Sequence, residues 1–275
     1  MQSQPLQSSR EYGYSGPCTD WYKKQESPAI IVPILLNALR PRTVLDVGCG
    51  IGIWSREFLE KGVSITAVDG AWVPESELVI PKGLFRTIDL MKGWVPEEQY
   101  DLAVCLEVAE HLPEQAGIAL IDALVRAAPV VCFSAAIPGQ GGFEHINERF
   151  QDYWIRQFEA RGYLAWDLVR PLVWTNENVR YYYAQNTMLF VDRSHVANVP
   201  GLHGSIPPPF IPTPVHPSLY LRASDPRFYS LKQVLKNLPH YLVRFGRHAL
   251  GQHKARRQGR ETGSDLRERV TGPDA

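Results

Sequence analysis

The sequence lacks the features typical of membrane proteins, secreted disulfide-bonded proteins, metal sites and serine hydrolases. It has no run of 18 apolar residues and no apolar signal-peptide core, so neither a transmembrane helix nor a leader is predicted. Its four cysteines lie far apart with no C-x-x-C pair, which predicts a cytoplasmic protein without disulfides. H-E-x-x-H, G-x-S-x-G and metal-ligand spacing of Asp, Glu or His are absent as well. We therefore expect neither a metal site nor a serine hydrolase.

The formal net charge is zero, because the charges of 29 basic and 29 acidic residues cancel. A neutral chain indicates no polyanionic partner, nucleic acid included. The charge is uneven, however. Residues 226–260 hold nine Lys and Arg and no acid, whereas residues 1–225 hold 25 acidic and 18 basic residues. The basic segment interleaves apolar residues with cations, which predicts a solvated tail, peripheral contact with an anionic membrane, or docking on the acidic body.

Composition divides the 275 residues into four segments. We predict a flexible arm at 1–25, a globular domain at 26–197, an extended proline-rich linker at 198–217 and a basic, partly disordered extension at 218–275. One helix is predicted in the extension, at 226–237.

Short β patterns alternate with amphipathic helices in the globular segment. Helices are predicted at 27–39, 53–62, 113–128 and 147–163, and strands at 43–48, 64–69, 83–89, 100–108, 129–136, 163–171 and 186–193. Strands separated by helices predict an α/β fold whose parallel sheet is covered on both faces. The aromatic segment 172–186 is too long for an ordinary hairpin loop, and it predicts a functional flap or an oligomer contact.

The stretch VLDVGCGIGIWS, residues 44–55, places three glycines between a strand and a helix, where open α/β sheets bind ligands. A dinucleotide fingerprint, G-x-G-x-x-G, would need a third glycine at residue 53, which is Ile53. The spacing here is G-x-G-x-G. Asp46, just upstream, would repel a pyrophosphate but would attract a cation. S-adenosylmethionine carries an ammonium and a sulfonium group and has no phosphate.

Four motifs in order, VLDVGCGIG, ITAVD, TIDL and YDLAVCLEVAEHLPE, resemble those of class I S-adenosylmethionine-dependent methyltransferases. The resemblance covers residues 26–193. It implies a doubly wound, Rossmann-like sheet of seven strands, mostly parallel with an antiparallel last strand, and helices on both faces. It also implies the cofactor contacts: Asp46, Gly48, Gly50 and Gly52 around the methionine part, Asp69 at the ribose, Asp89 and Leu90 near the adenine, and Glu107 and Val108 at the cofactor's edge.

Methyl transfer to a hydroxyl requires alignment of the reacting atoms and removal of a proton. His111 and His145 each follow a strand at the ligand-binding edge, and they are candidate catalytic bases; fixing a loop by hydrogen bonding is the alternative role. The run HINERFQDYW resembles bacterial methyltransferases that act on sugars, surface glycans or secondary metabolites. We therefore predict O-methylation of a small-molecule or glycan acceptor, with acceptor contacts at Asn147, Tyr153, Trp154 and Tyr182.

Two other functions fit part of the pattern. An NAD-linked oxidoreductase would also carry an acid at Asp69, after the second strand. A non-catalytic module would bind S-adenosylmethionine without transferring its methyl group. For Tyr153 and Trp154, helical spacing with Ile155 and Phe158 makes core packing the alternative to acceptor binding.

Overall fold

A computed structural model describes residues 24–202 and 211–224, together with residues 235 and 238. The predicted N-terminal arm and the predicted helix at 226–237 lie almost entirely outside these residues. The chain divides into two units, residues 1–220 and residues 221–275, and the first holds nearly all that is described. Within the described residues, no helix has both the length and the apolar character needed to cross a bilayer.

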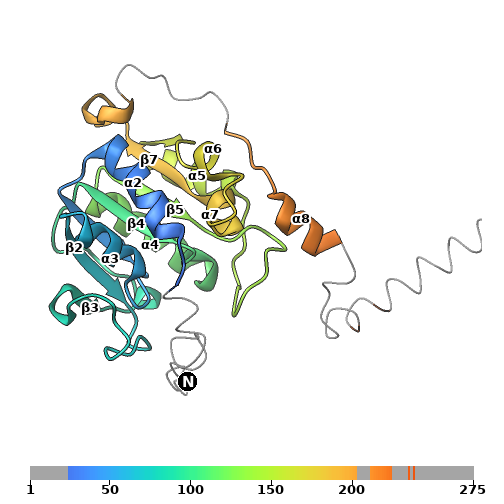
Figure 1. Ribbon diagram of the computed structural model, residues 1–275, viewed down its shortest axis with the longest axis horizontal. Coiled ribbons are helices and arrows are strands. Elements are labelled where there is room, and N and C mark those ends of the chain that lie inside the picture. Colours follow the sequence, from blue (N-terminus) through green and yellow to red (C-terminus); the bar gives the residue numbers. More distant parts are fainter. Residues whose placement is uncertain (1–23, 203–210, 225–234, 236–237, 239–275) are drawn as a thin grey trace, which may run out of the picture. The chain divides into compact units, whose positions relative to one another are not determined.

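A seven-stranded sheet forms the centre of the first unit (Figure 1). Its strands lie in the order β3-β2-β1-β4-β5-β7-β6. Neighbours are parallel except that β7 is antiparallel to both β5 and β6. This confirms the predicted fold class and places the antiparallel strand inside the sheet. The strands are β1 (Thr43–Val47), β2 (Ser64–Asp69), β3 (Phe85–Thr87), β4 (Leu102–Leu106), β5 (Val130–Ser134), β6 (Tyr163–Trp166) and β7 (Met188–Asp192).

Helices cover both faces of the sheet because both faces are apolar. The strand β4 shows this best: Leu102, Val104 and Leu106 join one core cluster, and Ala103 and Cys105 join the other. Residues of α2 and α3 pack in the first cluster, and residues of α4 and α5 pack in the second. The helices are α2 (Ser27–Leu39), α3 (Ile53–Glu60), α4 (Glu114–Ala127), α5 (Gln151–Glu159), α6 (Arg170–Val173), α7 (Tyr181–Asn186) and α8 (Pro217–Ser224).

The glycine loop that leaves β1 needs its glycines for backbone geometry. Gly48, Gly50 and Gly52 all have positive φ, at 73°, 55° and 88°. A Cβ built on Gly48 would lie 2.3 Å from a methyl carbon of Val108, which follows β4. The loop is therefore held closely against the end of β4. In the strand order, β1 lies between β2 and β4, so this is the switch point of the sheet.

Two predicted elements have different bounds in the structure. The helix predicted at 147–163 begins only at Gln151, because the backbone N–H groups of Asn147 and Arg149 donate to the carbonyls of Glu110 and Ala136. The strand predicted at 163–171 ends at Trp166, and the aromatic segment after it is not a loop but contains α6 and α7. Tertiary hydrogen bonds override the local pattern at both places.

The end of the proline-rich segment is packed, which corrects the prediction of an extended linker through residue 217. Ile211 joins the second core cluster. The carbonyl of Pro212 accepts from the Nη2 of Arg170 at 3.0 Å, and the N–H of His216 donates to Gln185 Oε1 at 2.8 Å. Arg170 and Gln185 are buried, so their polar atoms need partners, and this segment supplies one to each. The helix α8 then follows where none was predicted.

Candidate active site

The carboxylate of Asp69 connects the end of β2 to the glycine loop. Its Oδ2 accepts from the N–H of Gly50 at 2.6 Å, and its Oδ1 accepts from the N–H of Gly70 at 2.6 Å. The residue is 5% exposed. Burial raises the pKa of Asp69 to about 6, although the two backbone donors oppose the shift. The side chain of Trp72 also hydrogen-bonds this carboxylate. Because a carboxylate offers about four lone-pair sites, one remains for a ribose hydroxyl.

The residues of this edge fit S-adenosylmethionine better than a dinucleotide. Two buried carboxylates, Asp46 and Asp69, lie at or beneath the glycine loop. The negative charge of these carboxylates would repel a pyrophosphate placed over Gly50, whereas it would attract a sulfonium or ammonium group. The positive-φ glycines also leave bare backbone for a close approach.

Asp46 lies inside the fold beneath the loop. Its Oδ2 accepts from the hydroxyl of Ser55, at the start of α3, at 2.6 Å, and only 3% of the residue is exposed. Burial raises its pKa to about 7, and the charge of Asp69 adds to the shift. Contact with the methionine part of the cofactor stays a prediction.

Without cofactor, Asp46→Asn is expected to raise the free energy of unfolding at pH 8 by about 1–3 kcal/mol. The pKa of Asp46 is about 7 in the folded chain and 3.8 ordinarily, so the folded state binds the proton more tightly. The contribution of Asp46 to the stability of the wild type must then fall as the pH rises from about 4 to about 7 and stay level above, and the difference between the variant and the wild type isolates this contribution. Urea unfolding at several pH values measures this. The prediction is wrong if the difference in free energy of unfolding between Asp46→Asn and the wild type does not grow from about pH 4 to about pH 7.

The predicted adenine contacts are divided between surface and core. Asp89 is exposed, and its carboxylate accepts from the N–H of Met91 at 3.0 Å and pairs with Lys92 at 3.1 Å. It thereby caps the short turn η2 (Leu90–Lys92). Leu90 is 7% exposed and packs in the second core cluster. Their role at the adenine stays a prediction.

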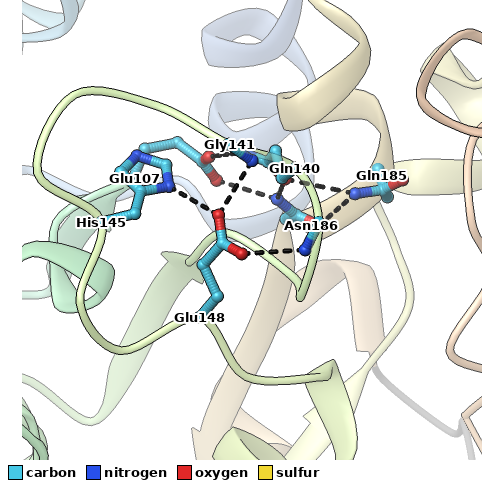
Figure 2. Close-up of polar contacts among 8 residues, drawn as sticks. Glu107, Gln140, Gly141, His145, Glu148, Gln185 and Asn186 are labelled. Carbon is cyan, nitrogen blue, oxygen red and sulfur yellow. Dashed lines mark hydrogen bonds and ion pairs between the residues drawn. The ribbon is translucent and has the colours of Figure 1, made fainter. Parts of the chain in front are cut away.

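Glu107 is held in a network of amide side chains just after β4 (Figure 2). Gln140 Nε2 donates to its Oε2 at 2.7 Å, and Asn186 Nδ2 donates to its Oε1 at 3.1 Å. Gln185 Nε2 donates in turn to Gln140 Oε1 at 3.3 Å and to Asn186 Oδ1 at 3.0 Å. Burial raises the pKa of Glu107, and its φ of 58° is unusual for a residue other than glycine. Such strain occurs most often at functional sites.

The two histidines predicted as bases lie side by side, with ring centroids 4.8 Å apart and planes at 89°. His111 belongs to the turn η3 (Ala109–His111) after β4, and His145 belongs to the loop after β5. His145 Nδ1 contacts Glu148 Oε1 at 3.0 Å. Glu148 also accepts from the N–H groups of Gly139 at 2.8 Å and Gly141 at 2.9 Å, which fixes the loop (Figure 2).

The carboxylate of Glu110 completes this cluster. One ligand atom each from Glu110, His111 and His145 lies within 4.8 Å of the others. Sequence spacing predicts no metal-ligating group, yet folding brings these three together from two loops. Burial raises the pKa of Glu110 well above its usual range, and the charge of Glu107 adds to the shift. Burial lowers the pKa of His111 to about 4.

The predicted acceptor contacts occupy four different environments. Trp154 is 1% exposed and packs against Phe133 in the core, which agrees with the core-packing alternative, and its contact with the acceptor stays a prediction. Asn147 is also buried, and its Nδ2 donates to the carbonyl of Ala109 at 3.4 Å. Tyr153 donates its hydroxyl to Glu114 at 2.9 Å. Tyr182 is half-buried on α7, and burial raises its pKa, with the charge of Glu107 adding to the shift.

Sequence reasoning missed the amide residues around Glu107. Gln140 comes from the loop after β5, and Gln185 and Asn186 come from the end of α7. Single Gln and Asn residues carry no spacing signal. Their side chains converge only because β7, which follows α7, pairs with β5.

Comparison with known proteins identifies the family. Residues 22–163, slightly more than half of the chain, match the family model described as a methyltransferase domain. The chain is 34% identical over 125 residues to a ubiquinone biosynthesis O-methyltransferase of Stutzerimonas stutzeri, which covers 42% of this chain and 49% of that protein. The protein of the same name from Bordetella avium is 35% identical over 111 residues, covering 36% and 45%. The matched region thus spans about half the length of these curated relatives.

A solved magnesium protoporphyrin IX methyltransferase from Synechocystis PCC 6803, with bound S-adenosylhomocysteine, is 20% identical. The match covers 66% of this chain and 91% of that one, with a TM-score of 0.47. The family model, together with the glycine loop, the buried acids and the strand order, decides the assignment. The chain belongs to the methyltransferase domain family, in its class I, S-adenosylmethionine-dependent group.

Proposed function

We propose that this protein transfers a methyl group from S-adenosylmethionine to a hydroxyl oxygen of a small hydroxylated acceptor. The observation that carries the proposal is Asp69, a buried carboxylate bonded to the bare backbone of the glycine loop. The choice of oxygen as acceptor is supported by the curated relatives, which are named O-methyltransferases. Those relatives make a phenolic hydroxyl the first acceptor class to test, ahead of the sugar or glycan predicted from HINERFQDYW.

The cofactor would be held by Asp69 and the glycine loop, with Glu107 and Val108 at its edge. S-adenosylmethionine supplies an electrophilic methyl group on a sulfonium. The chain's own contribution is positioning and desolvation, which account for much of the acceleration in direct displacements. The amide network around Glu107 fixes that carboxylate in one orientation. The half-buried ring of Tyr182 helps to keep water from the same region.

A methyl-transfer screen tests this function. Full-length protein with S-adenosylmethionine carrying a tritiated methyl group would be offered catechols, monophenols, sugars and carboxylic acids. We expect label in base-stable ethers of hydroxylated compounds, and phenols labelled above sugars. Label only in carboxylic esters or amines would contradict O-methylation of hydroxyls. Cofactor binding without any transfer would favour the non-catalytic module, and binding of NADH in place of S-adenosylhomocysteine would favour the oxidoreductase.

A further inference from the structure

A cavity of about 240 Å³ lies against the part of the sheet formed by β1, β2 and β3. The strand β3 is at the edge of the sheet (Figure 1). Leu45 of β1 and Val68 of β2 line the cavity, and so do Trp94 and Tyr100 of the segment that connects β3 to β4. Leu45, Val68 and Tyr100 belong to the second core cluster. The cavity therefore lies on the face of the sheet that α4 and α5 cover elsewhere.

The cavity exists because no helix covers the sheet at this place. The crossovers that follow β1, β4 and β5 contain α3, α4 and α5. The crossover from β3 to β4, residues 88–101, is described throughout, and it contains the short turn η2 and no α-helix. An irregular segment turns fewer apolar side chains toward the sheet than an amphipathic helix does. Met91 and Val95 of this crossover are 54% and 62% exposed, and a gap is left above the strands.

The volume and the lining fit an aromatic compound of one or two rings. An apolar cavity of about 150 Å³ is enough to bind benzene. Trp94 and Tyr100 offer aromatic contacts, which stabilise a bound ring beyond its apolar area. Thr66, Thr87 and Glu97 also line the cavity, and their side-chain oxygens can accept hydrogen bonds. A ring with one N–H or O–H donor matches this lining.

The charges beside the cavity favour a neutral compound. Arg86 and Glu97 both line it, and Nη1 of Arg86 lies 3.8 Å from Oε2 of Glu97. Nη2 of Arg86 donates to Oε1 of Glu98 at 3.3 Å. An anionic ligand would meet the two acids, and a cationic ligand would meet the guanidinium group. Neither charge gains much at such an exposed ion-pair cluster.

The cavity adjoins the two strand ends that carry the acids expected at the nucleoside. Val68 directly precedes Asp69, and Ile88, which also lines the cavity, directly precedes Asp89. The N–H of Ile88 donates to the carbonyl of Asp69 at 2.8 Å, which joins the two strand ends. A compound packed against Val68 and Ile88 would restrain both ends before the cofactor binds, so less ordering would be left for the cofactor to impose.

We propose that this cavity is a second binding site, for a neutral aromatic compound of one or two rings with one hydrogen-bond donor, whose occupancy raises the affinity for S-adenosylmethionine. Because a coupling free energy is reciprocal, the cofactor must raise the affinity for the compound by the same factor, typically about 5–150-fold. The coupling rests on the predicted contacts of Asp69 and Asp89 with the nucleoside. The binding site itself depends on neither those contacts nor the identity of the acceptor.

Indole is the probe, because it is neutral, has two fused rings and one N–H donor, and carries no hydroxyl to be methylated. Calorimetry on the full chain should show one equivalent bound. Thr66→Leu should weaken binding at least about 10-fold, because the larger side chain fills the cavity. The matched control is Ser64→Leu, two residues earlier on β2, where the side chain is exposed and outside the lining. Benzoate and benzylamine should bind at least about 10-fold more weakly than indole, because each buries a charge.

Fluorine NMR of protein labelled with fluorotryptophan locates the bound compound. The signal of Trp94, assigned by its loss in Trp94→Phe, should move when indole is added, whereas the signal of Trp154 should stay. The amide hydrogens of residues 88–101 should exchange more slowly with indole bound. If Thr66→Leu does not fold, Trp94→Ala replaces it, since this variant removes an aromatic side chain from the lining and should weaken indole binding as well.

Indole that does not bind, or that binds while the Trp94 signal stays in place, would overturn the site. Equal binding to the wild type and to a folded Thr66→Leu variant would do the same. Benzoate or benzylamine bound as tightly as indole would reject the choice of a neutral ligand. An unchanged Kd for S-adenosylhomocysteine with indole bound would overturn the coupling. A protein that binds indole as expected and methylates no acceptor would leave the site standing and reject the proposed function.

Discussion

Asp69→Asn is expected to weaken binding of S-adenosylmethionine by about 100-fold, since hydrogen bonds to a charged acceptor contribute about 1.5–3 kcal/mol each. The variant loses the charge that the ribose hydroxyls would contact. It also turns an amide toward the N–H of Gly50 or of Gly70, both of which need an acceptor. Calorimetry with S-adenosylmethionine and with S-adenosylhomocysteine measures the change. Both ligands should be affected, because they share the ribose.

The matched control for Asp69 is Asp101→Asn. Asp101 is also a carboxylate that accepts from two backbone N–H groups, those of Arg42 at 2.7 Å and Thr43 at 3.0 Å. Asp101 lies at the amino ends of β1 and β4, whereas the glycine loop lies at the carboxyl end of β1. Its replacement should change the unfolding temperature without changing cofactor affinity. Equal loss of affinity in both variants would show that the effect of Asp69 is only structural.

Trp154→Ala is expected to lower the free energy of unfolding by about 3–5 kcal/mol, the usual result of deleting a buried aromatic side chain. Trp154 packs against Phe133 with ring centroids 5.3 Å apart and against Tyr153 at 4.9 Å. The cavity left behind would lie between α5 and β5. Urea unfolding monitored by far-ultraviolet circular dichroism measures the loss.

A milder variant separates packing from acceptor binding at the same position. Trp154→Phe keeps an aromatic ring, and it deletes no hydrogen bond, because Nε1 of Trp154 has no partner among the described residues. If the side chain serves only the core, this variant should lose some stability and keep the KM for the acceptor. A several-fold rise in KM at unchanged stability would restore the sequence prediction of an acceptor contact.

Much of the fold could be predicted from the sequence because its signals are local. The glycine spacing after β1 requires positive φ, which only glycine adopts at low cost, and the observed angles agree. The alternation of strands and helices along the chain predicted a parallel sheet with helices on both faces. Asp69 at the end of β2 was expected at the ligand edge, and it lies there, bonded to Gly50.

The site beyond the cofactor loop depends on long-range contacts that no local pattern encodes. Gln140, Asn186 and Glu107 meet because β7 inserts between β5 and β6. Trp154 has the same helical spacing whether its ring faces a pocket or the core, and only the packing of α5 on the sheet decided for the core.

The sequence by itself determined the chain's family, its strand-and-helix alternation and the acids that surround the glycine loop, because each of these depends on residues close together in the chain. Only the tertiary structure brought Glu110 and His111 to His145, across 33 intervening positions. The physical reason is that parallel strands end at one edge of the sheet, so loops distant in sequence share a single small volume there.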